Sequence, residues 1–181
     1  MARKPRTISR YQKEQLRGDM RFDSLKIYRF SSMVMKEGKR ALSYKIIYDA
    51  LDHVHHSFEK SQEVKSDKPK DERIMELFDK AIDISRPSFE VKSKRIGGAN
   101  YQIPVEVSRS RQEVIVMRWI IEHARKRKGE PAWKRIATEI LDILNERGTV
   151  IKAKSNLESM ARANFAFYKR DKSKSESQGS N

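Results

Sequence analysis

The sequence predicts a mainly α-helical protein. It should form a six-helix domain with an inserted two-stranded β-hairpin, or ribbon, between helices 3 and 4, flanked by a basic N-terminal arm and a disordered C-terminal tail. Three observations predict this fold class. Apolar residues recur every three or four positions over most of the chain, one stretch at 88–107 alternates instead, and both ends are charged and poor in apolar residues. A length of 181 residues fits one domain.

Composition narrows the function further. Lys and Arg total 40 against 25 Asp and Glu, which gives a net charge of +15 and predicts a polyanionic partner, nucleic acid or an acidic membrane face. The chain has no Cys, so disulfides, thiolate catalysis and Cys-ligated metal sites are excluded. No apolar run approaches the roughly 18 residues of a membrane span, and residues 1–21 lack the apolar block of a secretory signal. We therefore expect no membrane partner.

The first third of the chain should contain an arm, two helices and a loop. Residues 1–23 are predicted to form a basic arm that folds against RNA or DNA. Ser24 can cap a first helix at 24–36, which Gly38 stops. An i, i+3, i+4, i+7 apolar pattern predicts a second helix over 39–56. Residues 57–70 mix both charge signs and are predicted to be an extended surface loop.

A third helix begins near Ile74 and stops before Arg86, because the residue before a proline avoids the helical region. Alternation in 89–96 and 101–107 around a turn at 97–100 then predicts the ribbon, with one apolar and one basic face. Pro104 requires an edge or a bulge. Two interpretations stay about equally open. The ribbon lies along a nucleic-acid groove, or it covers the helical core with lysines guarding an edge strand.

Three helices follow. The fourth runs from about Arg109 to Gly129, the fifth opens at Pro131, and the sixth starts behind Ser155 with a capping-box pattern. Residues 24–170 thus make up the folded domain, and 171–181 a disordered tail. Trp119 and Trp133 lie on or beside apolar stripes and are interpreted as core residues rather than base-stacking ones.

The run 109–135 is the strongest signal of a binding surface, because its apolar stripe leaves nine bases on the solvent side against three glutamates. Other chemistry lacks support. His53 and His56 share a helical face with Asp49, but one face rarely completes a metal site. No nucleophile, carboxylate pair or phosphate loop of known spacing is present. We expect no catalytic residues, no cofactor and no metal, and hence no enzyme.

Residues 85–107, SRPSFEVKSKRIGGANYQIPVEV, resemble the signature of the family of the seventh protein of the small ribosomal subunit, in its bacterial and organellar form. Further matches are KEGKR at 36–40, MRWI at 117–120, ARKR at 124–127 and MARANFAF at 160–167. The order and spacing agree over about 24–170, and a match of this continuity is highly specific.

The resemblance implies a structural protein of the small ribosomal subunit that binds the 3′ major domain of its rRNA and nucleates assembly of the head. It also places the ribbon near the exit-site tRNA and the mRNA path, with the ninth and eleventh small-subunit proteins as neighbours. The implied rRNA-binding residues are Arg3, Lys4, Arg6, Arg10, Lys36, Lys39, Arg40, Arg86, Lys92, Lys94, Arg95, Gly97, Gly98, Arg109, Arg111, Arg118, Arg125, Lys126 and Arg127. The residues expected on the tRNA and mRNA side are Lys94, Arg95, Tyr101, Lys152, Lys154, Lys169 and Arg170.

The chain also departs from the family pattern, in the long 57–70 segment, the shortened end at 167–170 and the added tail. These departures favour a mitochondrial ribosome slightly over one in the bacterial cytoplasm. An alternative function stays open on the residues alone. Helices and a ribbon that contains a proline could also embrace duplex DNA, as architectural DNA-binding proteins do.

Overall fold

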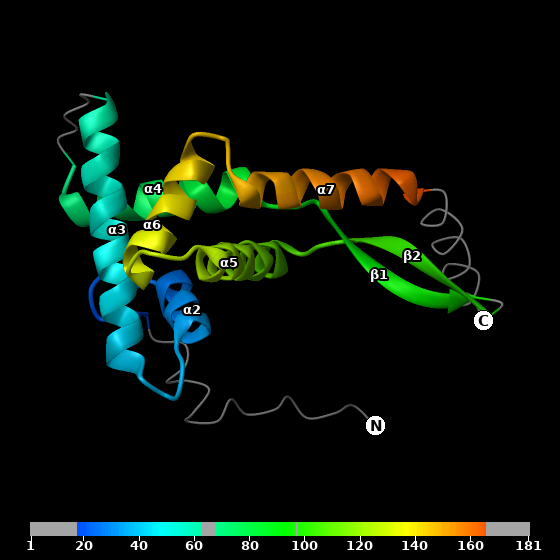
Figure 1. The fold of residues 1–181 in the computed structure, drawn as a ribbon, viewed down its shortest axis with the longest axis horizontal. Coiled ribbons are helices and arrows are strands. Elements are labelled where there is room, and N and C mark those ends of the chain that lie inside the picture. Colours follow the sequence, from blue (N-terminus) through cyan, green and yellow to red (C-terminus); the bar gives the residue numbers. More distant parts are fainter. Residues whose placement is uncertain (1–17, 63–67, 97, 166–181) are drawn as a thin grey trace, which may run out of the picture.

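A computed structural model of the chain describes residues 18–62, 68–96 and 98–165. In these ranges six helices and one two-stranded sheet follow in the predicted order (Figure 1). The elements are α2 Leu25–Val34, α3 Arg40–Gln62, α4 Lys70–Ser85, β1 Phe89–Ile96, β2 Ala99–Glu106, α5 Arg109–Lys126, α6 Ala132–Leu144 and α7 Thr149–Ala163. The mainly helical fold class is confirmed. The predicted tail at 171–181 lies outside the described residues.

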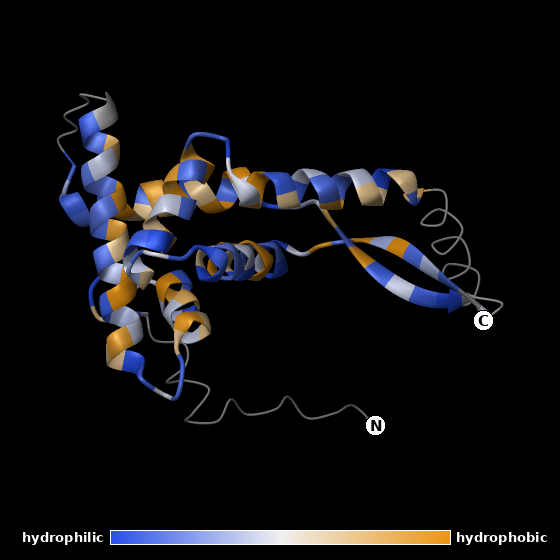
Figure 2. Ribbon diagram, viewed as in Figure 1, coloured by the Kyte–Doolittle hydropathy of each residue, from blue (hydrophilic) through white to orange (hydrophobic). Residues whose placement is uncertain are grey.

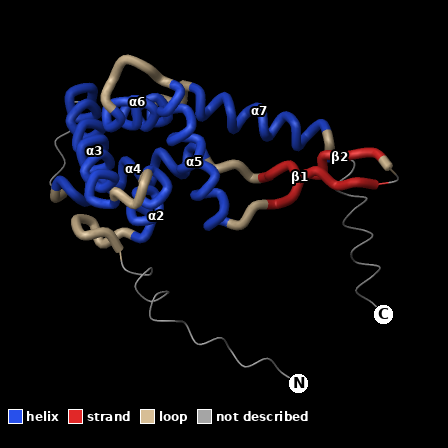
Figure 3. The backbone as a smooth tube through the Cα atoms, turned by 60° about the horizontal axis from the view of Figure 1, so that its bottom comes forward, coloured by secondary structure: helices blue, strands red, loops and turns tan. Residues whose placement is uncertain are grey.

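Helices α2 to α6 gather into one body, and α7 and the ribbon extend away from it side by side (Figures 1 and 3). Apolar side chains from all six helices form a single buried cluster at the centre of this body. Phe30 of α2 and Phe78 of α4, for example, are fully buried, with ring centroids 5.6 Å apart. Hydropathy colouring shows apolar residues on the body and at the base of the ribbon, while the ribbon tip is polar (Figure 2).

The residues that lead into α2 are folded, although the prediction assigned them to a basic arm over 1–23. The buried carboxylate of Asp19 accepts hydrogen bonds from three backbone N–H groups, those of Arg21, Phe22 and Ser24, and from the hydroxyl of Tyr48. The predicted arm is therefore too long at its C-terminal end, because residues 18–23 belong to the folded domain. The rest of the predicted arm, 1–17, lies outside the described residues.

Helix α3 is longer than predicted, because it continues to Gln62 through the first part of the segment assigned to a loop. Tertiary contacts explain the difference. Phe58 packs against the core cluster, and the carboxylate of Glu59 lies 2.6 Å from a guanidinium nitrogen of Arg73 on α4. The predicted start of the loop at residue 57 is thus wrong. Residues 63–67 lie outside the described ranges.

Helix α7 begins at Thr149, six residues before the predicted start at Ser155. Gly148, with φ 97°, turns the chain directly out of the α6–α7 connection, and Val150 in the first turn is fully buried. A buried apolar side chain holds this first turn in place, so the weaker cap at Ser155 is not used.

The ribbon pairs antiparallel from Phe89↔Glu106 to Ile96↔Ala99, which leaves two residues between the strands where four were expected. Pro104 pairs with Val91 without a bulge. In a two-stranded sheet every position is on an edge, so a residue without an amide hydrogen is tolerated. The base of the ribbon rests on α7. Just beyond the end of this helix, the ring of Phe165 meets that of Phe89 edge to face, with centroids 5.9 Å apart.

Candidate nucleic-acid interface

Helix α5 links the ribbon to the far end of the helical body. Arg111, Arg118 and Arg125 follow one another at intervals of seven residues, so they lie on nearly one side of the helix, about 10.5 Å apart along its axis. All three side chains are exposed. The helix begins shortly after β2, and a line of exposed arginines therefore runs from the ribbon base along α5.

The ribbon end of this line is tied to the sheet. The guanidinium of Arg111 donates to the carboxylate of Glu90 on β1, with N–O distances of 2.9 and 3.4 Å. This hydrogen bond keeps the pKa of Glu90 below its usual range. Arg109, at the start of α5, is exposed to solvent. The pair with Glu90 joins α5 to the ribbon base, which is also held by the contact between the rings of Phe89 and Phe165.

The other end of the line meets the connection between α2 and α3. Here Glu37 and Gly38 adopt positive φ values of 53° and 70°, which turn the chain sharply between the helices. The guanidinium of Arg40 lies 5.1 Å from the ring centroid of Tyr28, a cation–π contact that positions it. Lys36 and Lys39 flank the same turn, and both are exposed.

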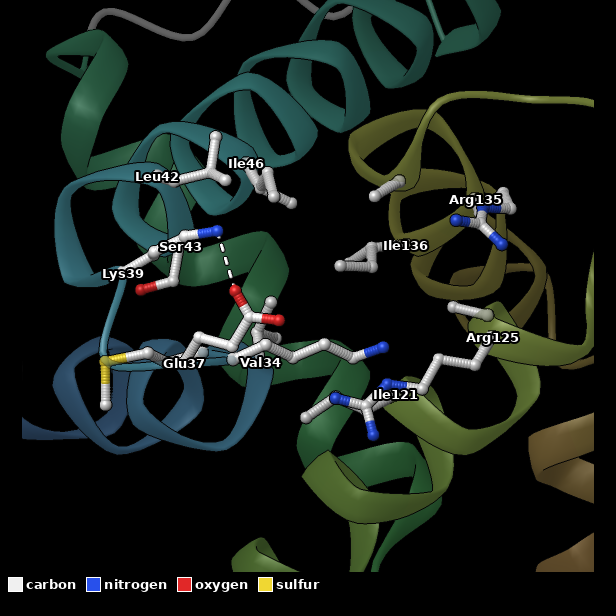
Figure 4. A pocket seen from close by; sticks show the side chains of 14 residues that line it. Val34, Glu37, Lys39, Leu42, Ser43, Ile46, Ile121, Arg125, Arg135 and Ile136 are labelled. Atoms are coloured by element: carbon white, nitrogen blue, oxygen red, sulfur yellow. Dashed lines mark hydrogen bonds and ion pairs between the residues drawn. The ribbon is translucent and has the colours of Figure 1, made fainter.

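A hollow of about 340 Å³ opens between this turn and α5 (Figure 4). Leu42 and Ile46 of α3, Ile121 and Arg125 of α5, and Ile136 of α6 face it from different sides. A second hollow adjoins it and shares Ile121 and Arg125 with the first. The exposed cations that line the two hollows are Lys36, Lys39, Arg118, Arg125 and Lys126. Together with the exposed Arg40, which follows Lys39 in the chain, they are called the basic face.

The predicted separation of the ribbon into an apolar and a basic face is wrong. Cross-strand partners lie on the same face of a sheet, and the register pairs Lys92 with Ile103 and Lys94 with Tyr101. Ser93 and Arg95 likewise share a face with Val91 and Pro104, two positions or more toward the base. Polarity changes along the ribbon instead. Pro104 and Ile103 are buried in the half of the ribbon toward the base, whereas Lys92, opposite Ile103, and the side chains at 93–95 toward the tip are exposed.

Two predicted binding residues, Arg86 and Arg127, are engaged in ion pairs with carboxylates of neighbouring helices. The guanidinium of Arg127 lies 2.6 Å from Glu139, whose side chain is 1% exposed, and 2.8 Å from Asp142. Arg86 bonds Glu113 at 2.9 Å and Asp83 at 2.8 Å. In both cases a carboxylate within the protein already neutralises the charge. Their principal role in the structure is to join helices, which the sequence did not reveal.

The remaining candidates are scattered. Gly98 at the ribbon tip has φ 89° and open space around it, which leaves its backbone accessible. Tyr101 is half-buried, and Lys152 is exposed on α7. The ammonium of Lys154 donates to the carbonyl oxygen of Ile84 at 2.7 Å and thereby caps the end of α4. The candidates outside the described residues are Arg3, Lys4, Arg6, Arg10, Gly97, Lys169 and Arg170.

Arg135 was predicted only as one of the nine bases of the run 109–135, not as an individual rRNA-binding residue. Its side chain lines the first hollow, and its Nη1 donates to the carbonyl oxygen of Arg127 at 2.8 Å. The run therefore marks the charge of this arginine in the sequence, whereas its position at the hollow depends on the packing of α6 against α5.

Other kinds of site are not formed by the described residues. In those ranges no three His, Asp or Glu side chains come together as metal ligands would. His53 packs edge to face against the ring of Trp133, and Trp133 and Trp119 both pack against the core, as predicted. A search of the same ranges finds no helix with the length and apolar character of a membrane span.

Comparisons with known proteins all lead to one family. The family model described as ribosomal protein S7p/S5e matches residues 5–164. Three bacterial relatives are each described as small ribosomal subunit protein uS7. That of Desulfotalea psychrophila is 36% identical over 86% of this chain and 92% of its own length. That of Chloroflexus aggregans is 41% identical over 82% and 87%. That of Marinobacter nauticus is 40% identical over 86% and 92%.

These relatives do not support the expected preference for a mitochondrial ribosome, since the organisms are bacteria. They do not support the architectural DNA-binding alternative either. The family consists of structural proteins of the ribosome rather than enzymes. Because the match spans most of this chain and most of each relative, the protein belongs to the ribosomal protein S7p/S5e family.

Proposed function

We propose that this protein is a structural constituent of the small ribosomal subunit, where it binds the 3′ major domain of the rRNA and nucleates assembly of the head. The observation that carries the proposal is the line of arginines on α5, which joins the ribbon to the basic face. Each phosphate that such a surface contacts releases condensed counterions, so the surface binds RNA without any catalytic group.

The proposal assigns the contacts unequally. The basic face and the exposed ribbon residues Lys92, Lys94 and Arg95 would bind rRNA phosphates, and the ribbon tip would lie near the exit-site tRNA and the mRNA path. Arg86 and Arg127 would contribute mainly by holding α4, α5 and α6 together beneath that surface. The ninth and eleventh small-subunit proteins would be neighbours in the head and platform.

The direct test is a binding titration of the full-length protein with a fragment of the 3′ major domain, an unrelated structured RNA and duplex DNA. We expect the ribosomal fragment to bind most tightly and its affinity to fall steeply as the salt concentration rises. Equal affinity for the two RNAs at physiological salt would refute the assignment. Tighter binding to duplex DNA would instead favour an architectural role on DNA.

A matched pair of variants locates the surface. Arg118→Gln with Arg125→Gln removes two charges from the basic face, whereas Lys60→Gln with Lys80→Gln removes two exposed charges elsewhere, on α3 and α4. The first variant should lower the slope of log affinity against log salt by about two, and the second should leave it nearly unchanged. Equal slopes for both variants would mean that the charge acts through the whole molecule rather than through this face.

Sedimentation of a cell extract through a sucrose gradient tests the cellular assignment. The protein should migrate with small ribosomal subunits after DNase treatment. The ribosome with which the protein co-sediments also identifies its cellular compartment.

A further inference from the structure

The hollow between α2, α3, α5 and α6 combines two kinds of surface. Its floor is apolar and is formed by Val34, Ile46, Ile121 and Ile136, and the half-exposed side chain of Leu42 extends it outward. Its volume of about 340 Å³ lies at the lower end of the roughly 300–1,000 Å³ of small-molecule sites. An apolar surface of this kind favours a group with apolar surface of its own that leaves water on binding.

The rim of the same hollow is cationic. Lys36, Lys39, Arg125 and Arg135 line it, and Glu37 is the one acidic side chain among the described lining residues. Glu37 is engaged by the ammonium of Lys39 at 2.7 Å, as the dashed line in Figure 4 shows. The opening therefore carries an excess of positive charge and suits a ligand that is anionic where it leaves the hollow.

The side chain of Arg135 is held against the hollow from the α5 side. Its Nη1 donates to the carbonyl oxygen of Arg127 at 2.8 Å, so the side chain that lines the hollow is positioned before any ligand binds. A cation held in place in this way loses little side-chain entropy when a phosphate binds, which favours an anionic group at this side of the hollow.

We propose that the hollow accommodates one unpaired nucleotide of RNA, with its base on the apolar floor and its phosphates against Lys36, Arg125 and Arg135. This inference rests on the proposed function, which brings RNA to the basic face. Phosphates alone would need no apolar floor, and an apolar peptide would need no cationic rim. RNA-binding proteins commonly take unstacked bases from single-stranded loops and bulges into such surroundings, including the planes of Arg guanidinium groups.

The test uses the full-length protein and two short single-stranded oligoribonucleotides of equal length, one of mixed sequence and one with abasic sites throughout. Both carry the same phosphates. The oligonucleotide with bases should bind at least about fivefold more tightly than the abasic one, the low end of the effect of burying a single base. A fragment of the 3′ major domain is titrated in parallel.

Ala132→Trp fills the hollow without changing any charge, since Ala132 lines it at the start of α6. This variant should bring the affinity for the mixed-sequence oligonucleotide to within about twofold of the abasic value, because the base loses its floor. Ala153→Trp is the matched control. Ala153 is also half-buried, but it lies on α7 and does not line the hollow, so the preference for bases should persist.

Two outcomes would overturn the proposal while leaving rRNA binding intact. In the first, the protein binds the 3′ major domain but does not prefer the oligonucleotide with bases. In the second, folded Ala132→Trp keeps the full preference, which would leave the hollow to a protein partner.

If Ala132→Trp does not fold, crosslinking of the wild-type protein to an oligonucleotide containing 4-thiouridine decides. Crosslinks must fall in residues 34–46 or 121–136. Failure to bind the 3′ major domain would instead refute the proposed function itself.

Discussion

Arg125 and Arg127 lie two positions apart at the end of α5, yet they belong to two different regions of the molecule. Arg125 is exposed on the basic face. Arg127 points into the junction of α5, α6 and α7, where Glu139 is 1% exposed and also accepts a hydrogen bond from the hydroxyl of Thr149 at 3.0 Å. A buried carboxylate therefore determines which of the two arginines is used for folding. The arginines without such a partner remain available to an external polyanion.

The largest expected loss of unfolding free energy comes from a substitution in the junction of α5, α6 and α7. Arg127→Ala leaves the carboxylate of Glu139 buried without its charged partner, which should cost about 2 kcal/mol of unfolding free energy, because Glu139 is buried although the side chain of Arg127 is itself 35% exposed. Arg125→Ala should cost less than about 0.5 kcal/mol, as for most exposed sites. Urea denaturation of both variants measures the difference. Equal losses would show that burial of Glu139 does not distinguish the two regions.

The ribbon should behave like the basic face. Lys92→Gln with Arg95→Gln removes two exposed charges, so affinity for the 3′ major domain fragment should fall about tenfold at low salt while the unfolding free energy stays nearly constant. A filter-binding titration together with thermal unfolding measures both quantities. A large loss of stability would place these side chains with the junction rather than with the RNA-binding surface.

Arg21 lies between these two cases, the arginine paired in the junction and the exposed cations. Its guanidinium bonds Asp52 at 2.7 Å, and the pair is partly exposed. The hydrogen bond from Arg21 lowers the pKa of Asp52 to about 2 in the folded protein. A carboxylate with a depressed pKa stabilises the fold above its unfolded value of about 3.9, and this stabilisation is lost as the pH falls from there toward 2.

The effect should be about 1 kcal/mol, because solvent screens a pair this exposed. Unfolding free energies at pH 5 and pH 2.5 should therefore differ less for Asp52→Asn than for the wild-type protein, after the common acid effect of the other carboxylates is subtracted. An identical pH dependence for the two proteins would show that the pair contributes nothing to the entry of α2.

The smallest change in unfolding free energy is expected from a substitution on the basic face. Lys126 pairs with Glu122 one turn away on α5, and the two side chains are 64% and 54% exposed. Lys126→Gln should change the unfolding free energy by less than about 0.5 kcal/mol, as for other exposed pairs on a helix. Thermal unfolding checks this value. A loss as large as that of Arg127→Ala would abolish the distinction between the two regions.

The elements and their order could be predicted from the sequence, because apolar residues repeat along each helix or strand at the spacing of that structure. Ile136 and Ile140 of α6 repeat with the helical spacing, and both are buried. Helix ends were less predictable. The last turns of α3 depend on Phe58 and on the pair between Glu59 and Arg73, whose partners lie on other elements.

The site was predictable only as a set of residue types. The basic run and the double glycine mark α5 and the ribbon in the sequence, and both carry exposed cations in the structure. The ribbon faces could not be derived, because they follow from the register of two strands, and a shift of one residue exchanges the faces. The hollow could not be derived either, since its lining comes from four helices.

The sequence by itself therefore determined the positive charge, the helical and strand periods and the family signature, all of which are properties of residues near one another in the chain. Tertiary structure alone decided which cations are neutralised internally, as at Arg127 and Arg86, and which remain exposed, as at Arg118 and Arg125. The physical reason is that pairing and burial depend on distances between groups far apart in sequence, and folding sets those distances.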